Sequence, residues 1–220
     1  MSMGSGIGNH HSSFVVELLK DCAKRKDVHK GIQLHANILN RGLLQKSLYV
    51  ASALINMYAK CGELGEAQNV LEELPVRDVV SWSSLIAGYV RQGQGHEALE
   101  CFEIMRNEGL FANEVTFICI LKACGIIGAI DKGKQIHDEI VSKGLLANNI
   151  SLGNVLVDMY ARCGVLAQAQ ETFDTLQIWD VVTWSTLIAG YAHHGQGERA
   201  LVCFRQSLGH GISPNPSIFL

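Results

Sequence analysis

The chain contains 220 residues, of which 48% are hydrophobic and 18% are charged, and its formal net charge is −3. No apolar run is long enough to span a membrane, so we expect no membrane-embedded segment. Proteins that bind nucleic acids are often basic, so the negative charge argues against binding that rests mainly on phosphate contacts.

The N-terminal residues 1–11 are rich in glycine and serine and precede the first regular apolar pattern. We expect this segment to be disordered, as chain ends without tertiary contacts often are. It also makes a poor organellar transit peptide, because the first arginine of the chain is Arg25.

From Ser12 onward the chain divides into helical hairpins, and residues 79–113 illustrate the pattern. Trp82, Leu85, Ile86 and Tyr89 have the i, i+3, i+4, i+7 spacing of one apolar helix face. Glycines then allow a tight turn, a second apolar helix follows, and Gly109 stands where a C-terminal cap glycine is expected. In chain order the predicted repeats are 12–47 (long), 48–78 (short), 79–113 (ordinary), 114–149 (long), 150–180 (short) and 181–215 (ordinary).

The second half of the chain is a variant of the first. When the numbering is shifted by 102, residues 48–113 and 150–215 align without a gap, with 29 identities in 66 positions. Stacked repeats bury their apolar faces against each other and present one long surface, which favours binding over catalysis. The sequence therefore predicts an all-α fold, a right-handed α-solenoid of six helix-turn-helix hairpins.

The C-terminal residues 216–220 match the start of a seventh hairpin. Solenoids normally end in a polar capping unit, whereas this chain ends on Ile218, Phe219 and Leu220. We therefore expect the chain to be a fragment or a truncated product of a longer protein.

The cysteines and histidines do not indicate a metal site or an enzyme. Six of the seven cysteines form pairs one 102-residue block apart, at packing positions, and the sequence has no Cys-x-x-Cys motif. His137 and Glu139 match half of the zinc deaminase signature, but no Pro-Cys-x-x-Cys follows. We expect His35 and His137 to be packing residues, no metal or cofactor, and no enzymatic activity.

The cycle of ordinary, long and short repeats resembles the pentatricopeptide repeat family of plants, in its class with three alternating repeat types. The phrases that carry the resemblance are Asp78-Val79-Val80-Ser81-Trp82, Leu121-Lys122-Ala123-Cys124, Gly133-Lys134-Gln135-Ile136-His137 and Asp158-Met159-Tyr160-Ala161-Arg162-Cys163-Gly164. The resemblance implies binding of single-stranded RNA, with one base read by each repeat.

In this family, base choice follows a two-residue code that uses the fifth and the last residue of a repeat. Carried onto this sequence, the code pairs Ser52 with Asp78 (guanine), Ser83 with Asn113 (adenine), Asn154 with Asp180 (uracil) and Ser185 with Asn215 (adenine). The second residues of these repeats, expected to flank the bases, are Tyr49, Val80, Ser151 and Val182. Ser83 lies one residue off the apolar stripe, so we expect it to point outward from the core.

The long repeats depart from the code because their fifth residues, Val16 and Ile118, cannot form hydrogen bonds. The resemblance therefore implies the RNA core 5′-NGANUA-3′, where N is unread. A structural alternative stays open for the polar residues, because Asp78 and Asp180 could instead cap the following helices. The two roles are compatible.

The resemblance further implies organellar RNA processing in a mitochondrion or chloroplast, as the recognition part of a C-to-U editing factor. A protein-binding adaptor of the tetratricopeptide kind, or a subunit that recruits other editing-complex proteins, is the alternative. Unequal repeat lengths and the absence of the Trp-x-x-Leu-Gly-x-x-Tyr pattern count against the tetratricopeptide interpretation.

Overall fold

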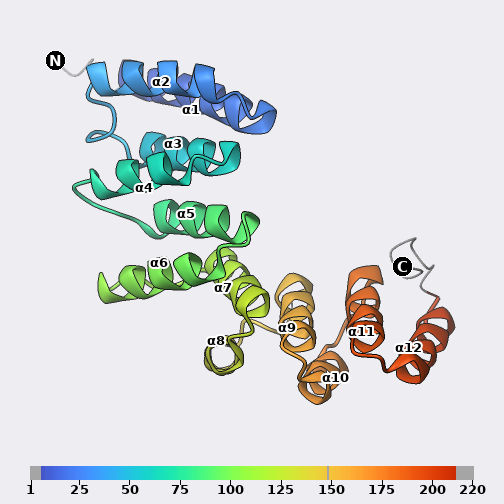
Figure 1. The fold of residues 1–220 in the computed structure, drawn as a ribbon. Helices are drawn as coiled ribbons and strands as arrows, with labels where there is room; N and C mark the ends of the chain where they lie inside the picture. Colours follow the sequence, from blue (N-terminus) through green and yellow to red (C-terminus); the bar gives the residue numbers. More distant parts are fainter. Residues whose placement is uncertain (1–5, 148, 212–220) are drawn as a thin grey trace. The chain divides into compact units, whose positions relative to one another are not determined.

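The computed structural model describes residues 6–147 and 149–211, and the secondary structure of this part of the chain is entirely helical (Figure 1). The all-α prediction is therefore confirmed. The helices are α1 (Gly6–Arg25), α2 (Val28–Asn40), α3 (Leu48–Cys61), α4 (Leu64–Glu72), α5 (Val79–Arg91), α6 (Gly95–Asn107), α7 (Glu114–Ile127), α8 (Ile130–Ser142), α9 (Ile150–Arg162), α10 (Leu166–Thr175), α11 (Val181–His193) and α12 (Gly197–Gly209).

Each predicted repeat holds two of these helices, and we call them its first and second helix. The first helices α3, α5, α7, α9 and α11 begin at the residues where the sequence places the repeat starts. The chain forms two compact units, one up to Thr116 and one from Phe117, and helix α7 runs across the boundary.

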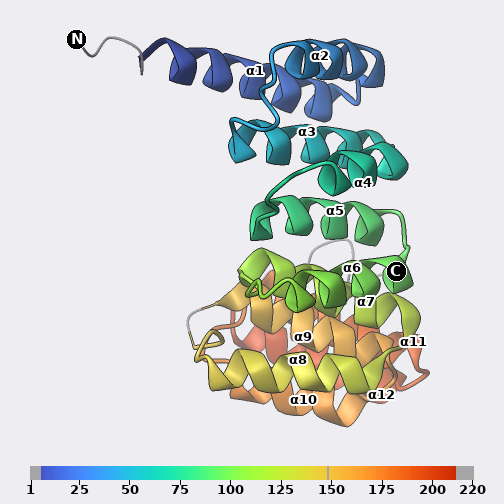
Figure 2. The ribbon, with the colours of Figure 1, turned by 90° about the vertical axis from the view of Figure 1, so that its left-hand side faces the viewer.

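In the first unit the first helices form a row. Helix α3 lies between α1 and α5 and contacts both, while α2, α4 and α6 pack against the first helices of their own repeats (Figure 2). The predicted apolar stripe of α5 is confirmed, because Trp82, Leu85, Ile86 and Tyr89 are all buried. Burial of such stripes between neighbouring repeats gives the unit a continuous hydrophobic core.

The second unit repeats this arrangement. Helix α11 packs on α9, α8 and α10 contact α9, and α12 contacts α11. Buried residues at the counterparts of the first-unit stripe include Trp184, Leu187, Ile188 and Tyr191. The sequence identity between the two blocks therefore corresponds to the same packing.

Left-handed glycines turn the chain between the two helices of the short repeats. Gly62 follows α3 with φ of 95°, and Gly164 follows α9 with φ of 77°. Side chains with a Cβ rarely adopt this conformation, so glycine ends the first helix and lets the second fold back against it.

The N-terminus corrects one prediction. The segment 1–11 was expected to be disordered; residues 1–5 lie outside the described residues, but residues 6–11 belong to α1, which begins at Gly6. The buried residues Val15, Val16 and Leu19 anchor the C-terminal part of this helix. Once a helix is nucleated, each added residue contributes one hydrogen bond, and no proline interrupts residues 6–11. The helix therefore extends upstream of its packed part.

The cysteines occupy the packing positions expected from the sequence. Cys22, Cys101, Cys124 and Cys203 are buried. Burial raises the pKa of the Cys101 and Cys124 thiols to about 12, which keeps them protonated and unreactive.

Among the described residues, no helix is long and apolar enough to cross a membrane.

Candidate nucleic-acid interface

The last residue of a predicted repeat caps the first helix of the next repeat. The Asp78 carboxylate accepts a hydrogen bond from the Ser81 backbone N–H at 2.8 Å, and the Asp180 carboxylate accepts one from Thr183 N–H at 2.8 Å. Asn113 Oδ1 likewise accepts from Thr116 N–H at 2.9 Å. The capping role considered for Asp78 and Asp180 is therefore confirmed. A carboxylate carries two acceptor oxygens, so capping is compatible with a further hydrogen bond.

The structure brings the fifth and the last residue of the same repeat together through the next helix. Ser52 Oγ lies 2.9 Å from Ser81 Oγ, and the Ser81 backbone N–H is the group that Asp78 caps. The short repeat at 48–78 therefore joins its two coding positions through one residue of α5.

The ordinary repeat at 79–113 shows the same connection. Ser83 Oγ lies 2.7 Å from Thr116 Oγ1, and the Thr116 hydroxyl donates to Asn113 Oδ1 at 2.9 Å. The bridging residue is in each case the third residue of the following repeat. Residues predicted to read one base thus lie in one hydrogen-bonded chain at the start of a first helix.

The repeat at 150–180 connects its pair directly, because Asn154 Nδ2 donates to Asp180 Oδ1 at 3.3 Å. Burial alone would raise the pKa of Asp180, but hydrogen bonds from the Thr183 backbone, the Thr183 hydroxyl and the Asn154 amide hold it below its ordinary value. Asp180 is therefore a carboxylate at neutral pH. Asn154 Oδ1 is buried and has no hydrogen-bond donor among the described residues.

The expected orientation of Ser83 is wrong. Ser83 was expected to point outward from the core, but only 5% of its surface is exposed, and Ser52 is similarly buried at 7%. The apolar stripe describes burial within one hairpin, whereas the fifth residue is covered by the following first helix. Its polar tip therefore lies in the narrow space between two repeats.

The predicted base-flanking residues are exposed beside these pairs. Tyr49, Val80 and Val182 are each at least half exposed, and Ser151 is exposed as well. The second and fifth residues of a repeat are three apart on a helix and share a face. Helices α3, α5 and α9 therefore each begin with an exposed side chain next to a polar pair. The Lys20 ammonium also lies 5.9 Å from the centroid of the Tyr49 ring.

A row of basic residues was missed by the sequence analysis. The thirteenth residue of five of the six predicted repeats is basic and exposed, and these residues are Lys24, Lys60, Arg91, Arg162 and His193. Eleven residues make about three helical turns, so this residue and the second residue of the repeat share one helix face, about 16 Å apart. Comparing the same position in every repeat would have revealed the row, although the net charge of the chain hides it.

In the second unit the basic row borders a groove. A cavity of about 350 Å³ between α9 and α11 is lined by Arg162, His193, His194 and Thr186, among other residues. Arg162 is held in place by a 2.8 Å hydrogen bond from its Nε to Asp158. The groove places cationic and polar groups on the exposed face of two neighbouring first helices.

The remaining coding positions differ from these pairs. Ser185 is partly exposed and donates to the Val181 carbonyl, while Asn215 lies outside the described residues. In the long repeats, Val16 is fully buried and Ile118 is partly buried, and neither offers a hydrogen bond. The long repeats therefore have no polar side chain at the fifth position.

The two histidines of the second helices are packing residues, as predicted. His35 Nδ1 and His137 Nδ1 each lie 2.9 Å from a tyrosine hydroxyl, of Tyr58 and Tyr160 respectively. Burial lowers the pKa of both imidazoles, so they are neutral at neutral pH. His137 and Glu139 therefore belong to a packed helix, and the structure gathers no group of three metal-binding side chains among the described residues.

Paired helices, repeat-spaced caps and a repeated exposed face define a helical-repeat protein, in which the binding surface is built from the same positions of successive units. The model of the PPR repeat family matches residues 77–126, and the PPR repeat model matches residues 49–79 and 182–212. The chain belongs to the pentatricopeptide repeat family.

Relatives and solved structures agree with this assignment. A chloroplastic pentatricopeptide repeat-containing protein of Arabidopsis thaliana is 35% identical over 98% of this chain and 35% of its own length. The chloroplastic protein CRR2 of the same plant is 39% identical over 87% of this chain and 29% of its own length. This chain thus spans about a third of the length of these relatives.

The fold is similar to that of the pentatricopeptide repeat protein PPR10, whose crystal structure was solved with an 18-nucleotide psaJ RNA element. The TM-score is 0.72 at 19% sequence identity, over 93% of this chain and 30% of PPR10. A tetratricopeptide repeat protein from Parabacteroides merdae gives a TM-score of 0.57 at 14% identity. The chain therefore has the predicted helical-repeat solenoid fold.

Proposed function

We propose that this chain binds single-stranded RNA and reads one base with each ordinary or short repeat. The observation that carries the proposal is the hydrogen-bonded pairing of coding positions at the start of successive first helices. The reading residues are Ser52, Asp78, Ser83, Asn113, Asn154, Asp180, Ser185 and Asn215, and the RNA core is 5′-NGANUA-3′. PPR10, a family member with the same fold, was crystallised with RNA.

The Asn154 site supports the assignment of uracil. Its amide donates to Asp180, which leaves Oδ1 as a buried acceptor without a donor among the described residues. Uracil presents an N3–H donor between two carbonyl acceptors on its pairing edge. A uracil base entering between the repeats would therefore satisfy the orphaned oxygen, which otherwise costs free energy.

The exposed face of the first helices offers contacts to the faces of the bases and to the phosphates of the RNA. Tyr49 and the valines at the second positions offer surfaces against which bases pack. The basic row at the thirteenth positions lies on the same helix faces and is suited to phosphate contacts. Binding then combines base recognition with a limited number of ion pairs, in agreement with the net charge of −3.

We also propose the biological setting from the family. The unequal lengths of the repeats support the class with ordinary, long and short repeats. Relatives of similar sequence are named chloroplastic or mitochondrial, which supports action in one of these organelles. Within that setting, the chain would be the recognition part of a longer C-to-U RNA editing factor without catalytic activity of its own, working with other editing-complex proteins.

The proposal is tested by fluorescence-anisotropy titration of the chain with a labelled RNA that contains GANUA. A scrambled RNA of the same composition, at the same fixed salt concentration, is the control. We expect tighter binding to GANUA, by about tenfold for each 1.4 kcal/mol of base discrimination.

The variant Asn154→Ser sharpens this test, because the family code then pairs serine with Asp180. Preference at the fourth position of GANUA should shift from uracil toward guanine, while the other positions keep their preference. Equal binding of the parent chain to both RNAs, or a preference that does not follow the substitution, would contradict coded recognition. It would favour the protein-binding adaptor instead.

A further inference from the structure

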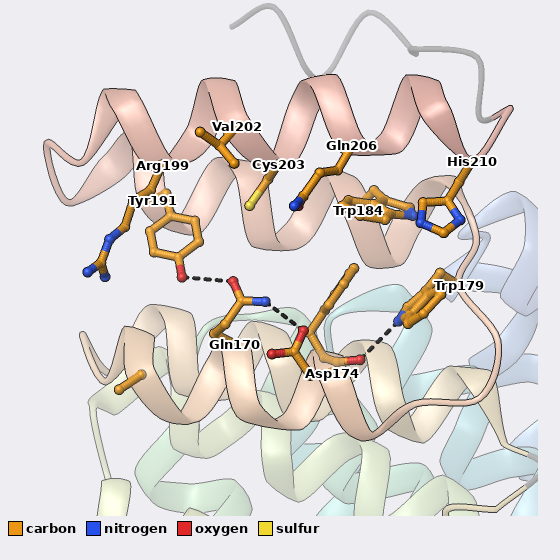
Figure 3. A pocket seen from close by; sticks show the side chains of 12 residues that line it. Gln170, Asp174, Trp179, Trp184, Tyr191, Arg199, Val202, Cys203, Gln206 and His210 are labelled. Carbon is orange, nitrogen blue, oxygen red and sulfur yellow. Dashed lines mark hydrogen bonds between the residues drawn. The ribbon is translucent and has the colours of Figure 1, made fainter.

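A large cavity among the described residues lies away from the coding positions. It has a volume of about 710 Å³ and lies between the second helices α10 and α12 and the first helix α11. Figure 3 shows Trp179, Trp184 and His210 at one end of it and Arg199 at the other. Phe173 and Trp184 form an edge-to-face pair, with ring centroids 4.7 Å apart. The cavity therefore has one aromatic end and one basic end.

Trp184 is a buried residue of this cavity that lacks a hydrogen bond among the described residues. Only 3% of its surface is exposed, and its indole Nε1–H has no hydrogen-bond acceptor among the described residues. The neighbouring Trp179 is satisfied, because its Nε1–H donates to the Phe173 carbonyl at 2.9 Å. A buried donor without an acceptor costs free energy, so an unpaired indole in this place needs an explanation.

The first 102-residue block shows which group fits this indole. Trp82 is the counterpart of Trp184, and its Nε1–H donates to Glu108 Oε2 at 2.8 Å. The other oxygen of Glu108 forms an ion pair with Arg77. In the second block, His210 stands at the position of Glu108 and Trp179 at that of Arg77. The second block thus keeps the indole donor but has no carboxylate at the position that bonds it in the first.

The residues around the cavity are less acidic in the second block than their counterparts in the first block. Its counterpart in the first block has glutamates at positions 97, 100 and 108, whereas the second block has Arg199, Val202 and His210. Three acidic side chains are thus replaced by a cationic, an apolar and an imidazole side chain, while one cation, Arg77, is replaced by Trp179. The lining carboxylate of Asp174 corresponds to Glu72 of the first block and accepts a hydrogen bond from Gln170 Nε2 at 2.8 Å. A negatively charged ligand is repelled less here than at the equivalent place of the first block.

We propose that this cavity binds an acidic peptide segment of a partner protein, with a glutamate or aspartate carboxylate accepting the hydrogen bond of Trp184 Nε1–H. The aromatic rings and Val202 contact the apolar neighbours of that acidic residue, and Arg199 faces the peptide at the other end. The ligand carboxylate takes the place that Glu108 occupies in the first block. This site is separate from the proposed RNA-reading positions.

His210 lies beside the indole of Trp184. The His210 and Trp184 ring centroids are 5.6 Å apart, and His210 is an exposed residue at the C-cap of α12. Rotation of an exposed side chain occurs within nanoseconds. The imidazole can therefore move aside and let a carboxylate reach the buried nitrogen.

The experiment titrates the full chain with a fluorescein-labelled peptide that carries one glutamate between leucines. The matched peptide has glutamine in place of glutamate. In ¹⁵N–¹H spectra the three tryptophans give three indole signals, which Trp→Phe variants assign. We expect the Trp184 signal to move with the glutamate peptide while that of Trp82 stays, and the glutamine peptide to bind at least about tenfold more weakly.

The variant His210→Glu supplies the missing carboxylate from the chain itself. It should fold at least as stably as the parent chain and bind the peptide at least about tenfold more weakly, because the indole is already bonded. The matched variant His210→Leu offers no acceptor to the indole and should keep peptide binding. Loss of binding in His210→Glu alone therefore cannot be ascribed to misfolding.

Three results would overturn the proposal. These are equal binding of the glutamate and glutamine peptides, unchanged binding by His210→Glu, and a Trp184 signal that moves with the GANUA RNA instead of the peptide. The last result would assign the cavity to RNA. The anisotropy titration with RNA is independent of this site, so the two proposals fail separately.

Discussion

Small polar side chains cap the first helices and also link the coding positions of a repeat. Asp78, Asn113 and Asp180 satisfy backbone N–H groups that an α-helix leaves without internal partners. The same groups lie within one hydrogen-bonded chain with Ser52, Ser83 or Asn154. In the proposed function, a base that enters between two repeats meets polar atoms that the fold already holds in place, which lowers the entropic cost of binding.

At this scale we predict a pH dependence of stability from His35 and His137. Burial lowers the pKa of both side chains in the folded chain below the ordinary value of 6.5. Below about pH 6.5 the unfolded chain therefore binds more protons, and the free energy of unfolding should fall as the pH decreases. Above that pH, both imidazoles are neutral in the folded and in the unfolded chain, so they no longer lower the free energy of unfolding.

The measurement is the urea midpoint at about pH 7.5 and about pH 5. The double variant with His35→Gln and His137→Gln cannot titrate in this range and retains a hydrogen-bonding group for the tyrosines. Its midpoint should decrease less between the two pH values than that of the parent chain. An equal decrease in both proteins would show that these imidazoles do not cause the effect. Asp180 titrates below this range because its pKa is lowered from 3.8.

At the scale of the helices, close crossings decide how successive repeats stack. Gly88 of α5 faces Ala59 of α3, and a Cβ built on Gly88 would lie 2.8 Å from the Ala59 Cβ. Gly190 of α11 faces Ala161 of α9, where a Cβ would again lie 2.8 Å from the alanine Cβ. The second block thus repeats a close approach that only glycine allows at this helix separation.

We predict that Gly88→Ala lowers the free energy of unfolding by about 1–3 kcal/mol, since the added methyl group must push two packed helices apart. Gly65→Ala in α4 is the control, because nothing lies within 4 Å of the new Cβ. It should be neutral or stabilising by up to about 1 kcal/mol. Urea denaturation of both variants measures the difference, and similar values for the two would refute the crowding of α3 and α5 as the cause.

At the scale of the whole molecule, the proposed RNA binding depends on basic residues that recur at one position of successive repeats. One lysine or arginine contributes little to affinity, but in this proposal basic residues at the same position of successive repeats meet successive phosphates of the bound strand. Their effect is electrostatic and independent of base identity. In the proposed function, the coding pairs and the basic row therefore control separate properties, namely specificity and the salt dependence of binding.

This separation gives a prediction for the triple variant Lys60→Gln, Arg91→Gln and Arg162→Gln. The slope of log K against log salt concentration should become shallower by about 0.7 for each phosphate that no longer pairs with a basic side chain. Affinity should fall by the same factor for GANUA and for the scrambled RNA, so the ratio between them is unchanged. The control Lys134→Gln removes an exposed charge from the second helix α8. Loss of specificity in the triple variant, or an equal effect of the control, would contradict the assignment.

Much of the fold could be predicted from the repeated pattern. The apolar spacing around Trp82 and the glycines after it specify a hairpin through local conformational preferences. The start of α1 at Gly6 could not be predicted from this pattern. The residues there continue a helix whose stability comes from the packed residues further along. The basic row was predictable in principle but required comparison of one position across all repeats.

The candidate site was predicted only in part. The code positions follow from repeat boundaries, and their capping role follows from residue type. The burial of Ser83 and its bond to Thr116 depend on the helix of the next repeat, 33 residues further along the chain. Periodicity within one hairpin contains no information about this contact.

The sequence by itself determined the helical hairpins, the 102-residue period and the family, because each depends on residue types at short, regular spacing. Only the tertiary structure decided which polar groups remain unsatisfied. Asn154 Oδ1 and Trp184 Nε1 lack partners among the described residues, although similar residues elsewhere are bonded. The reason is physical: a hydrogen bond needs a partner within about 3 Å, and packing decides which partner lies there.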